Sequence, residues 1–254
     1  MDPIKYLKRF DAYPVNELYL QDLARLQSLH MQHVPFENLD VIRKVPIYLN
    51  LESIYEKVVR QQRGGFCYEL NGLFCHLLKE LGFDAKLISA TVVKPDGSYA
   101  KSDTHAAIIV HLDTPYLVDV GFGDSTISPI PLGGERQTDN SGTYKIEETE
   151  HGLYKLTREH EGEEKILYLF SLEEKQLQDF HEGCVFNQVS EKSPFTHDDI
   201  VTRATPEGRM TLTGTTLTRT VDGKKEKQQL TESEKTAVLE SEFGIVLPTE
   251  KPLQ

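Results

Sequence analysis

Residues 63–74 read RGGFCYELNGLF, in which two glycines and a cysteine precede an apolar run with helical spacing. The apolar residues continue to Leu81 at intervals of three and four, and Gly82 then supplies the residue type that commonly ends a helix. We therefore predict a helix that begins near Cys67. A cysteine in the first turn has two explanations. It could be a reactive thiol, or it could be a buried thiol that packs on the same face as Leu70 and Phe74, as free cysteines commonly do.

The composition is that of a globular protein with ample apolar material for a core, with 38% hydrophobic and 27% charged residues among 254. A formal net charge of −12 argues against a nucleic-acid partner and against an anionic membrane surface, because both require clustered Lys and Arg. No apolar run approaches the roughly 18 residues of a transmembrane helix. The N-terminal residues MDPIKYLKRFDAYPV contain no apolar stretch typical of a signal peptide, so we expect none.

Cysteine usage bears on both compartment and metal binding. The sequence has three cysteines, an odd and sparse set, which favours reduced thiols and a cytoplasmic protein over a disulfide framework. It contains no CxxC pair, and the stretch HEGC (residues 181–184) has no second pair of ligands at metal spacing. We therefore expect no metal site.

The hydrophobic period changes along the chain. Up to residue 82 it is helical, with further helices predicted at residues 18–34 and 51–61. From Ala85 to about Phe180 it approaches two, which predicts a small antiparallel sheet or barrel. The predicted strands of this part cover residues 85–93, 104–112, 115–122, 144–149, 153–159 and 165–171. The last part has strand patterns at 197–205, 209–214 and 215–221, a charged turn DGKKEK expected as a solvated hairpin tip, and a helix at 231–245.

Two polar residues in apolar segments could accompany Cys67. His105 begins the apolar segment THAAIIVHL, and Asp119 lies within the predicted strand PYLVDVGF. A buried imidazole and a buried carboxylate each need a partner, and the DTP turn between their strands brings both to the same end of a hairpin. The turn does not fix their register. If they pair, Cys67, His105 and Asp119 have the residue types of a nucleophile, its base and the group that orients the base.

Each of these residues also has a structural explanation, as a core thiol, a strand-end histidine and a capped aspartate. At the positive end of a helix dipole, however, Cys67 would be favoured as a thiolate, and the adjacent glycines let a ligand approach closely. All three being structural at once is the less economical interpretation. The remaining candidates, namely Cys75, His76, His111 and Cys184, have no comparable surroundings.

Several segments resemble the signature segments of arylamine N-acetyltransferases. They are RGGFCYELNGLF, THAAIIV and YLVDVGFGD, together with HMQHVPFENLDV, SPFT and LESEFGIVL. The resemblance covers nearly the whole chain. It implies an α+β fold with a cysteine-protease-like Cys-His-Asp core, in three domains: a helical bundle (1–84), a β-barrel-like domain (85–190) and an α/β lid (191–254).

The resemblance also implies the chemistry. The catalytic residues of the family fall on Cys67, His105 and Asp119. Acetyl-CoA is the implied donor, and arylamines, arylhydrazines or N-hydroxyarylamines are the acceptors, with a role in xenobiotic metabolism. The reaction is a ping-pong transfer through an acetyl-cysteine, without a metal.

The family's other site residues transfer to this chain as well. Its pocket phenylalanines fall on Phe36 and Phe122, and the coenzyme A contacts fall near Thr104. The arginine of RGG and its glutamate partner fall on Arg63 and Glu37. The oligomeric state stays open.

Two other functions fit the same residues. A transglutaminase-like amidase or a thiol protease uses the same triad order, and a chain that only binds coenzyme A or an aromatic ligand could retain the residues without turnover. Release of coenzyme A in the absence of an amine would separate the three.

Overall fold

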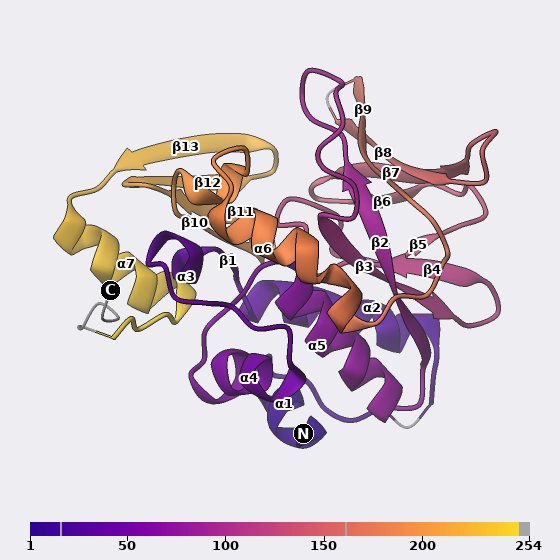
Figure 1. The fold of residues 1–254 in the computed structure, drawn as a ribbon, viewed down its shortest axis with the longest axis horizontal. Helices are drawn as coiled ribbons and strands as arrows, with labels where there is room; N and C mark the ends of the chain where they lie inside the picture. Colours follow the sequence, from indigo (N-terminus) through magenta and orange to yellow (C-terminus); the bar gives the residue numbers. More distant parts are fainter. Residues whose placement is uncertain (16, 161, 249–254) are drawn as a thin grey trace.

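The computed structural model describes residues 1–15, 17–160 and 162–248, and its helices and two sheets are shown in Figure 1. The helices of the N-terminal part are α1 (Pro3–Arg9), α2 (Leu20–His33), α3 (Leu39–Ile42), α4 (Leu51–Tyr55) and α5 (Cys67–Glu80). The helices predicted at 18–34 and from Cys67 onwards are confirmed as α2 and α5. The helix predicted at 51–61 is confirmed only to Tyr55, after which Glu56–Arg60 forms a π-helical turn.

Helix α5 is the centre of the largest hydrophobic core. Tyr68, Leu70, Leu73, Phe74 and Leu77 are almost fully buried, so this helix is apolar on more than one face. Buried residues of α1, α2 and α4 pack against one side of it, and β2 and β3 of the large sheet pack against the other. A helix enclosed in this way is held in place along its length by the core.

The middle of the chain forms an eight-stranded antiparallel sheet in the order β5-β4-β3-β2-β9-β8-β7-β6. Its strands are β2 (Asp84–Val92), β3 (His105–His111), β4 (Pro115–Val118), β5 (Ile130–Pro131), β6 (Gln137–Asp139), β7 (Gly142–Glu148), β8 (Tyr154–His160) and β9 (Glu163–Phe170). The sheet curls until β5 contacts β7, which makes it nearly closed (Figure 1). The predicted α+β class with a barrel-like sheet is confirmed.

One of the strand boundaries that were predicted wrongly affects the site. The strand predicted at 115–122 ends at Val118, whose partner on β3 is Ile108, so Asp119 lies in the loop beyond the ladder. The Asp119 carboxylate accepts a hydrogen bond from Gly121 N at 2.9 Å, which turns the chain on itself. His105 and Asp119 therefore meet through this loop, and not as partners across the hairpin.

The C-terminal part forms a five-stranded antiparallel sheet in the order β1-β10-β11-β12-β13. Its strands are β1 (Phe36–Glu37), β10 (Ile200–Thr205), β11 (Gly208–Thr213), β12 (Thr216–Val221) and β13 (Lys224–Gln229), and helix α7 (Glu232–Phe243) packs on it. The segment DGKKEK is not all hairpin tip: Asp222 and Gly223 make the turn with positive φ, and Lys224 begins an exposed edge strand. Alternation cannot reveal such a strand, because all six of its residues are solvent-exposed and hydrophilic.

Two elements connect parts of the chain that are distant in sequence. Strand β1, from the helical part, pairs with β10, and helix α6 (His181–Val189) packs its Cys184 into the core around α5. Short 3₁₀ turns at Leu177–Phe180 and Pro194–Thr196 flank α6. The division at residues 84 and 190 stays a prediction. Within the described part of the chain, no helix combines the length and apolarity needed to cross a bilayer.

Candidate active site

Cys67 is the first residue of α5 and is 3% exposed. Its Sγ lies 3.8 Å from the carbonyl oxygen of Thr104, the residue that precedes β3. Backbone N–H groups at a helix start have no acceptor within the helix and carry the positive end of its dipole. The thiol therefore lies where negative charge is favoured.

His105 and Asp119 form a buried pair. His105 Nε2 and Asp119 Oδ2 are 2.7 Å apart, and both residues are almost fully buried. Burial lowers the pKa of His105, but the charge of Asp119, the hydrogen bond to Asp119 and a hydrogen bond with Cys67 together raise it to about 10. The structure thus brings Cys67, His105 and Asp119 into one chain of contacts, with the imidazole in its charged form at neutral pH.

Two residues that hold Asp119 were not identified from the sequence. Asn71 donates from Nδ2 to Asp119 Oδ1 at 2.9 Å, and Tyr168 donates its hydroxyl to Asp119 Oδ2 at 3.0 Å. Burial raises the pKa of Asp119, but His105, Asn71 and Gly121 outweigh that effect and lower it. Asn71 follows Cys67 by four residues, so it shares a helix face with the cysteine. The amide of Asn71 on that otherwise apolar face is the feature of the sequence that could have indicated its role.

Gly121, in the segment VDVGFG, is required by the close approach of this loop to α5. A Cβ placed there would lie 2.7 Å from Asn71 Nδ2 and 2.7 Å from the Cα of Cys67. No side chain fits at those distances. The glycine therefore allows the loop that carries Asp119 to lie directly against the helix that carries Cys67.

A cavity of about 980 Å³ opens beside these residues. Cys67, His105 and Thr104 line it, and so do Phe36 and Phe122, the residues predicted to contact substrate. The ring of Phe122 lies 5.2 Å from that of His105, and the ring of Phe36 lies 5.8 Å from that of Phe195. The cavity is thus an aromatic space that reaches the thiol. Lysines also line it, at positions 94, 101 and 192.

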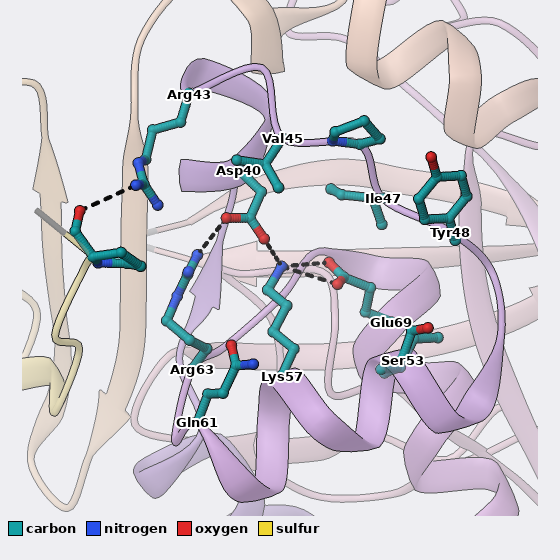
Figure 2. Close-up of a pocket in the computed structure, with 13 residues that line it drawn as sticks. Asp40, Arg43, Val45, Ile47, Tyr48, Ser53, Lys57, Gln61, Arg63 and Glu69 are labelled. Atoms are coloured by element: carbon teal, nitrogen blue, oxygen red, sulfur yellow. Dashed lines mark hydrogen bonds and ion pairs between the residues drawn. The ribbon is translucent and has the colours of Figure 1, made fainter. Parts of the chain in front are cut away.

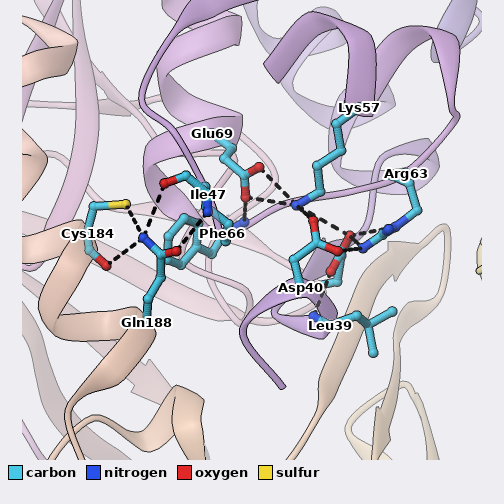
Figure 3. Close-up of polar contacts among 10 residues, drawn as sticks. Leu39, Asp40, Ile47, Lys57, Arg63, Phe66, Glu69, Cys184 and Gln188 are labelled. Atoms are coloured by element: carbon cyan, nitrogen blue, oxygen red, sulfur yellow. Dashed lines mark hydrogen bonds and ion pairs between the residues drawn. The ribbon is translucent and has the colours of Figure 1, made fainter. Parts of the chain in front are cut away.

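The predicted pair of Glu37 and Arg63 is present, with Arg63 Nη2 2.7 Å and Nε 3.0 Å from Glu37 Oε1. Asp40 and Lys57 join the same group of charges (Figure 3). Among the described residues, no three histidine, cysteine, aspartate or glutamate side chains are grouped so that they could hold a metal ion. Cys184, from the HEGC stretch, is buried and accepts a hydrogen bond from Gln188 Nε2 at 3.2 Å.

Comparison with known proteins identifies the class. A family model described as N-acetyltransferase matches residues 19–252. An uncharacterized acetyltransferase of Bacillus subtilis is 38% identical over 196 residues, covering 75% of this chain and 77% of its own. A pineal-gland arylamine N-acetyltransferase of Gallus gallus is 34% identical, covering 89% of each chain. The fold and these matches define an acyltransferase.

Solved structures give the same result. An arylamine N-acetyltransferase from Bacillus cereus superposes with a TM-score of 0.90 at 32% identity, over 97% of this chain and 100% of its own. The chain belongs to the arylamine N-acetyltransferase family. The Bacillus cereus structure is described as having a unique Cys-His-Glu catalytic triad, whereas this chain has Asp119 bonded to its histidine.

Proposed function

We propose that this acyltransferase carries an acetyl group from acetyl-CoA to arylamines, arylhydrazines or N-hydroxyarylamines through an acetyl-cysteine at Cys67. The observation that carries the proposal is the buried His105–Asp119 pair beside Cys67, in the wall of an aromatic cavity. The names of the relatives point to the same acceptor class. A thiol, an imidazolium and an orienting carboxylate are the groups that a cysteine-based acyl transfer needs.

In the first half-reaction, the Cys67 thiolate attacks the thioester carbonyl of acetyl-CoA. The new S–C bond gives a tetrahedral oxyanion, which N–H groups at the start of α5 stabilise. The C–S bond to coenzyme A then breaks, and the leaving thiolate takes the proton held by His105. Acetyl-Cys67 and neutral His105 remain.

In the second half-reaction, an amine attacks the acetyl-cysteine. Arylamines are weak bases and so are mostly neutral nucleophiles at pH 7. His105 accepts the proton lost by the attacking nitrogen, and the Cys67 thiolate leaves as the amide forms. Asp119 stabilises the imidazolium that is restored. Phe36 and Phe122 offer flat apolar walls for the aromatic ring of the acceptor.

The cavity also suits the charged donor. Lys94, Lys101 and Lys192 line it together with one carboxylate, Asp96, so its lining carries an excess of cations although the chain as a whole carries a net charge of −12. An excess of cations along a cavity of an acidic protein favours a local anionic ligand, which here would be the phosphates of coenzyme A. We assign the pantetheine arm to the segment at Thr104, whose carbonyl lies beside the thiol.

One experiment distinguishes this function from its rivals. The purified protein is mixed with acetyl-CoA and no amine, and released coenzyme A and protein mass are followed. An acetyltransferase of this type releases one coenzyme A per Cys67 and gains roughly 42 Da, the mass of an acetyl group held as a covalent intermediate. An amidase or protease releases none, and a binding protein shows affinity without release.

We keep the cytoplasm as the predicted compartment, since the three cysteines are free thiols.

A further inference from the structure

A second cavity, of about 550 Å³, lies near the start of α5 but does not contain the thiol (Figure 2). Glu69 lines it, whereas Cys67, two residues earlier, lines the cavity of the candidate active site. Four members of a cluster of five charged residues, here called the ionic cluster, line this cavity. The members of the ionic cluster are Glu37, Asp40, Lys57, Arg63 and Glu69.

Lys57 is the centre of the ionic cluster. Its Nζ lies 2.8 Å from Asp40 Oδ2, 2.9 and 3.2 Å from the two oxygens of Glu69, and 3.8 Å from Glu37 Oε1. The side chain is 12% exposed. Although burial disfavours its charged form, the three carboxylates raise the pKa of Lys57 above its ordinary value. The residue is therefore a buried cation at neutral pH.

Glu69 connects Lys57 to the backbone beside the nucleophile. Its Oε2 accepts a hydrogen bond from the amide of Phe66 at 3.1 Å, the residue directly before Cys67. A Cβ on Gly65 would lie 2.8 Å from the same oxygen, so the carboxylate is pressed against the chain at residues 65 and 66. Figure 3 shows Lys57, Glu69 and Phe66 in this order. Lys57 thus bonds a residue of the first turn of α5, and through it the backbone amide directly before Cys67.

Arg63 does not replace Lys57 in this role. Its guanidinium bonds Glu37 and Asp40, and of the cations in the described ranges, Lys57 is the one that bonds Glu69. Burial raises the pKa of Glu69, and the charge of Lys57 opposes that effect. With all five groups ionised, three carboxylates against two cations leave the ionic cluster with one negative charge. Without Lys57, a second buried negative charge would be uncompensated, which is costly in a protein interior.

The backbone supports Lys57 in an unusual way. It lies on the π-helical turn Glu56–Arg60, and its carbonyl accepts a hydrogen bond from the amide of Arg63 at 3.1 Å. Single π-helical turns are frequent at functional sites, where they aim particular side chains. This turn therefore positions both cations of the ionic cluster: it carries Lys57 and it binds the backbone of Arg63.

We propose that Lys57 is a positioning residue for Cys67: by holding Glu69 against the amide of Phe66, it fixes the first turn of α5, from which the thiol meets His105. This inference rests on the proposed role of Cys67 as the nucleophile. Lys57, which does not line the cavity of the thiol, would then contribute to the reaction and not to stability alone.

The test compares Lys57→Met, which keeps length but not charge, with the conservative Lys57→Arg. Lys79→Met is the matched control, because Lys79 lies in the last turn of α5, the helix that carries Cys67 and Glu69, in a half-exposed pair with Glu174. Acetylation of Cys67 is timed by mass spectrometry over a range of acetyl-CoA concentrations. Alkylation of Cys67 by iodoacetamide at pH 7, which needs no acetyl-CoA, is timed in parallel, and circular dichroism checks folding.

For Lys57→Met we expect the maximal acetylation rate to fall about tenfold, with the half-saturating acetyl-CoA concentration unchanged within about twofold, because a displaced nucleophile slows chemistry more than binding. Alkylation should slow in parallel. The acetylation and alkylation rates of Lys57→Arg should stay within about threefold of wild type. Those of Lys79→Met should equal the wild-type rates, since an exposed ion pair contributes little. A folded Lys57→Met protein with wild-type rates overturns the inference.

The double variant Lys57→Met/Glu69→Gln removes one charge of each sign, so it remains informative where Lys57→Met alone does not fold. If Lys57 acts through Glu69, the double variant acetylates Cys67 at the rate of Glu69→Gln alone. A further tenfold loss overturns the inference. If the wild type forms no acetyl adduct while its alkylation still depends on Lys57, the proposed function fails and the inference stands.

Discussion

Cys67 differs from the other two buried cysteines in what surrounds it. Burial raises the pKa of Cys75 and of Cys184 to about 12, so both are thiols at neutral pH. Cys67 instead contacts an imidazole that is positively charged at that pH. We expect Cys67→Ser to abolish transfer with the fold intact, because His105 cannot keep a hydroxyl ionised.

Steady-state turnover of the folded variant with acetyl-CoA and an arylamine measures this. Cys75→Ser and Cys184→Ser are the controls and should keep activity within about threefold, as neither thiol touches a base. Activity of Cys67→Ser within tenfold of wild type would remove Cys67 from the nucleophile role.

Asp119 is expected to matter through its charge as well as its shape. In Asp119→Asn the imidazolium loses its counter-charge, and we expect activity to fall by about 10⁴, the magnitude known for the same change in the serine-protease triad. The rate of iodoacetamide alkylation of Cys67 at pH 6 should fall as well. Circular dichroism must accompany the kinetics, and wild-type alkylation by a folded variant would contradict the scheme.

The pKa of His105 predicts how stability varies with pH. Its folded-state pKa of about 10 lies above its ordinary 6.5, so the stabilisation from the pair is complete below pH 6.5 and is lost as the pH rises towards 10. We expect the difference in free energy of unfolding between wild type and His105→Gln to be largest near pH 6 and to shrink towards pH 10. Urea unfolding at several pH values measures it, and a difference independent of pH would argue against a charged His105.

Among the elements, the loop after β4 depends most on one position. In Gly121→Ala, the new methyl group would meet Asn71 and the backbone of Cys67, both held by the core. We expect a loss of ~1–3 kcal/mol in the free energy of unfolding from overpacking and a lower rate of Cys67 acetylation.

Gly72→Ala in α5 is the matched control, because its Cβ would meet only the end of the Leu177 side chain, which can rotate away. It should be neutral or slightly stabilising, as alanine favours a helix over glycine. If both variants behave alike in urea unfolding and acetylation, the close approach at Gly121 is not the cause.

Periodicity predicted the elements that bury a regular face, including α5 and β3, and with them the positions of Cys67 and His105. It failed where a side chain interrupts the regular pattern: Asp119 bonds its own loop and ends β4 early. It could not identify Asn71 or Tyr168, because a polar atom on an apolar face has a meaning only once its partner is known. The residue types of the site were predictable, whereas the network that holds them depends on tertiary contacts.

At the scale of the whole molecule, charge is unevenly distributed between the surface and the cavity. The net charge is −12, yet Lys94, Lys101 and Lys192, against one carboxylate of Asp96, line the cavity proposed to bind coenzyme A. We expect the KM for acetyl-CoA to rise several-fold between roughly 0.02 and 0.5 M salt, because ions screen exposed charges over about 10 Å at 0.1 M. The KM for a neutral arylamine should change little. Equal responses of the two KM values would argue against an electrostatic role for these lysines.

Strand β1 has a consequence for the synthesis of the protein. Phe36 and Glu37 pair with Thr202 and Val201. Phe36, which lines the cavity, is therefore synthesised well before β10, the strand that its own strand β1 pairs with. Helix α5 and the strands that carry His105 can assemble before then, because all of them precede residue 119. A nascent chain halted near residue 195 would therefore hold the reactive thiol with one side of its cavity unfinished. The cell would meet a competent cavity only after the strand at residues 200–205 has been synthesised.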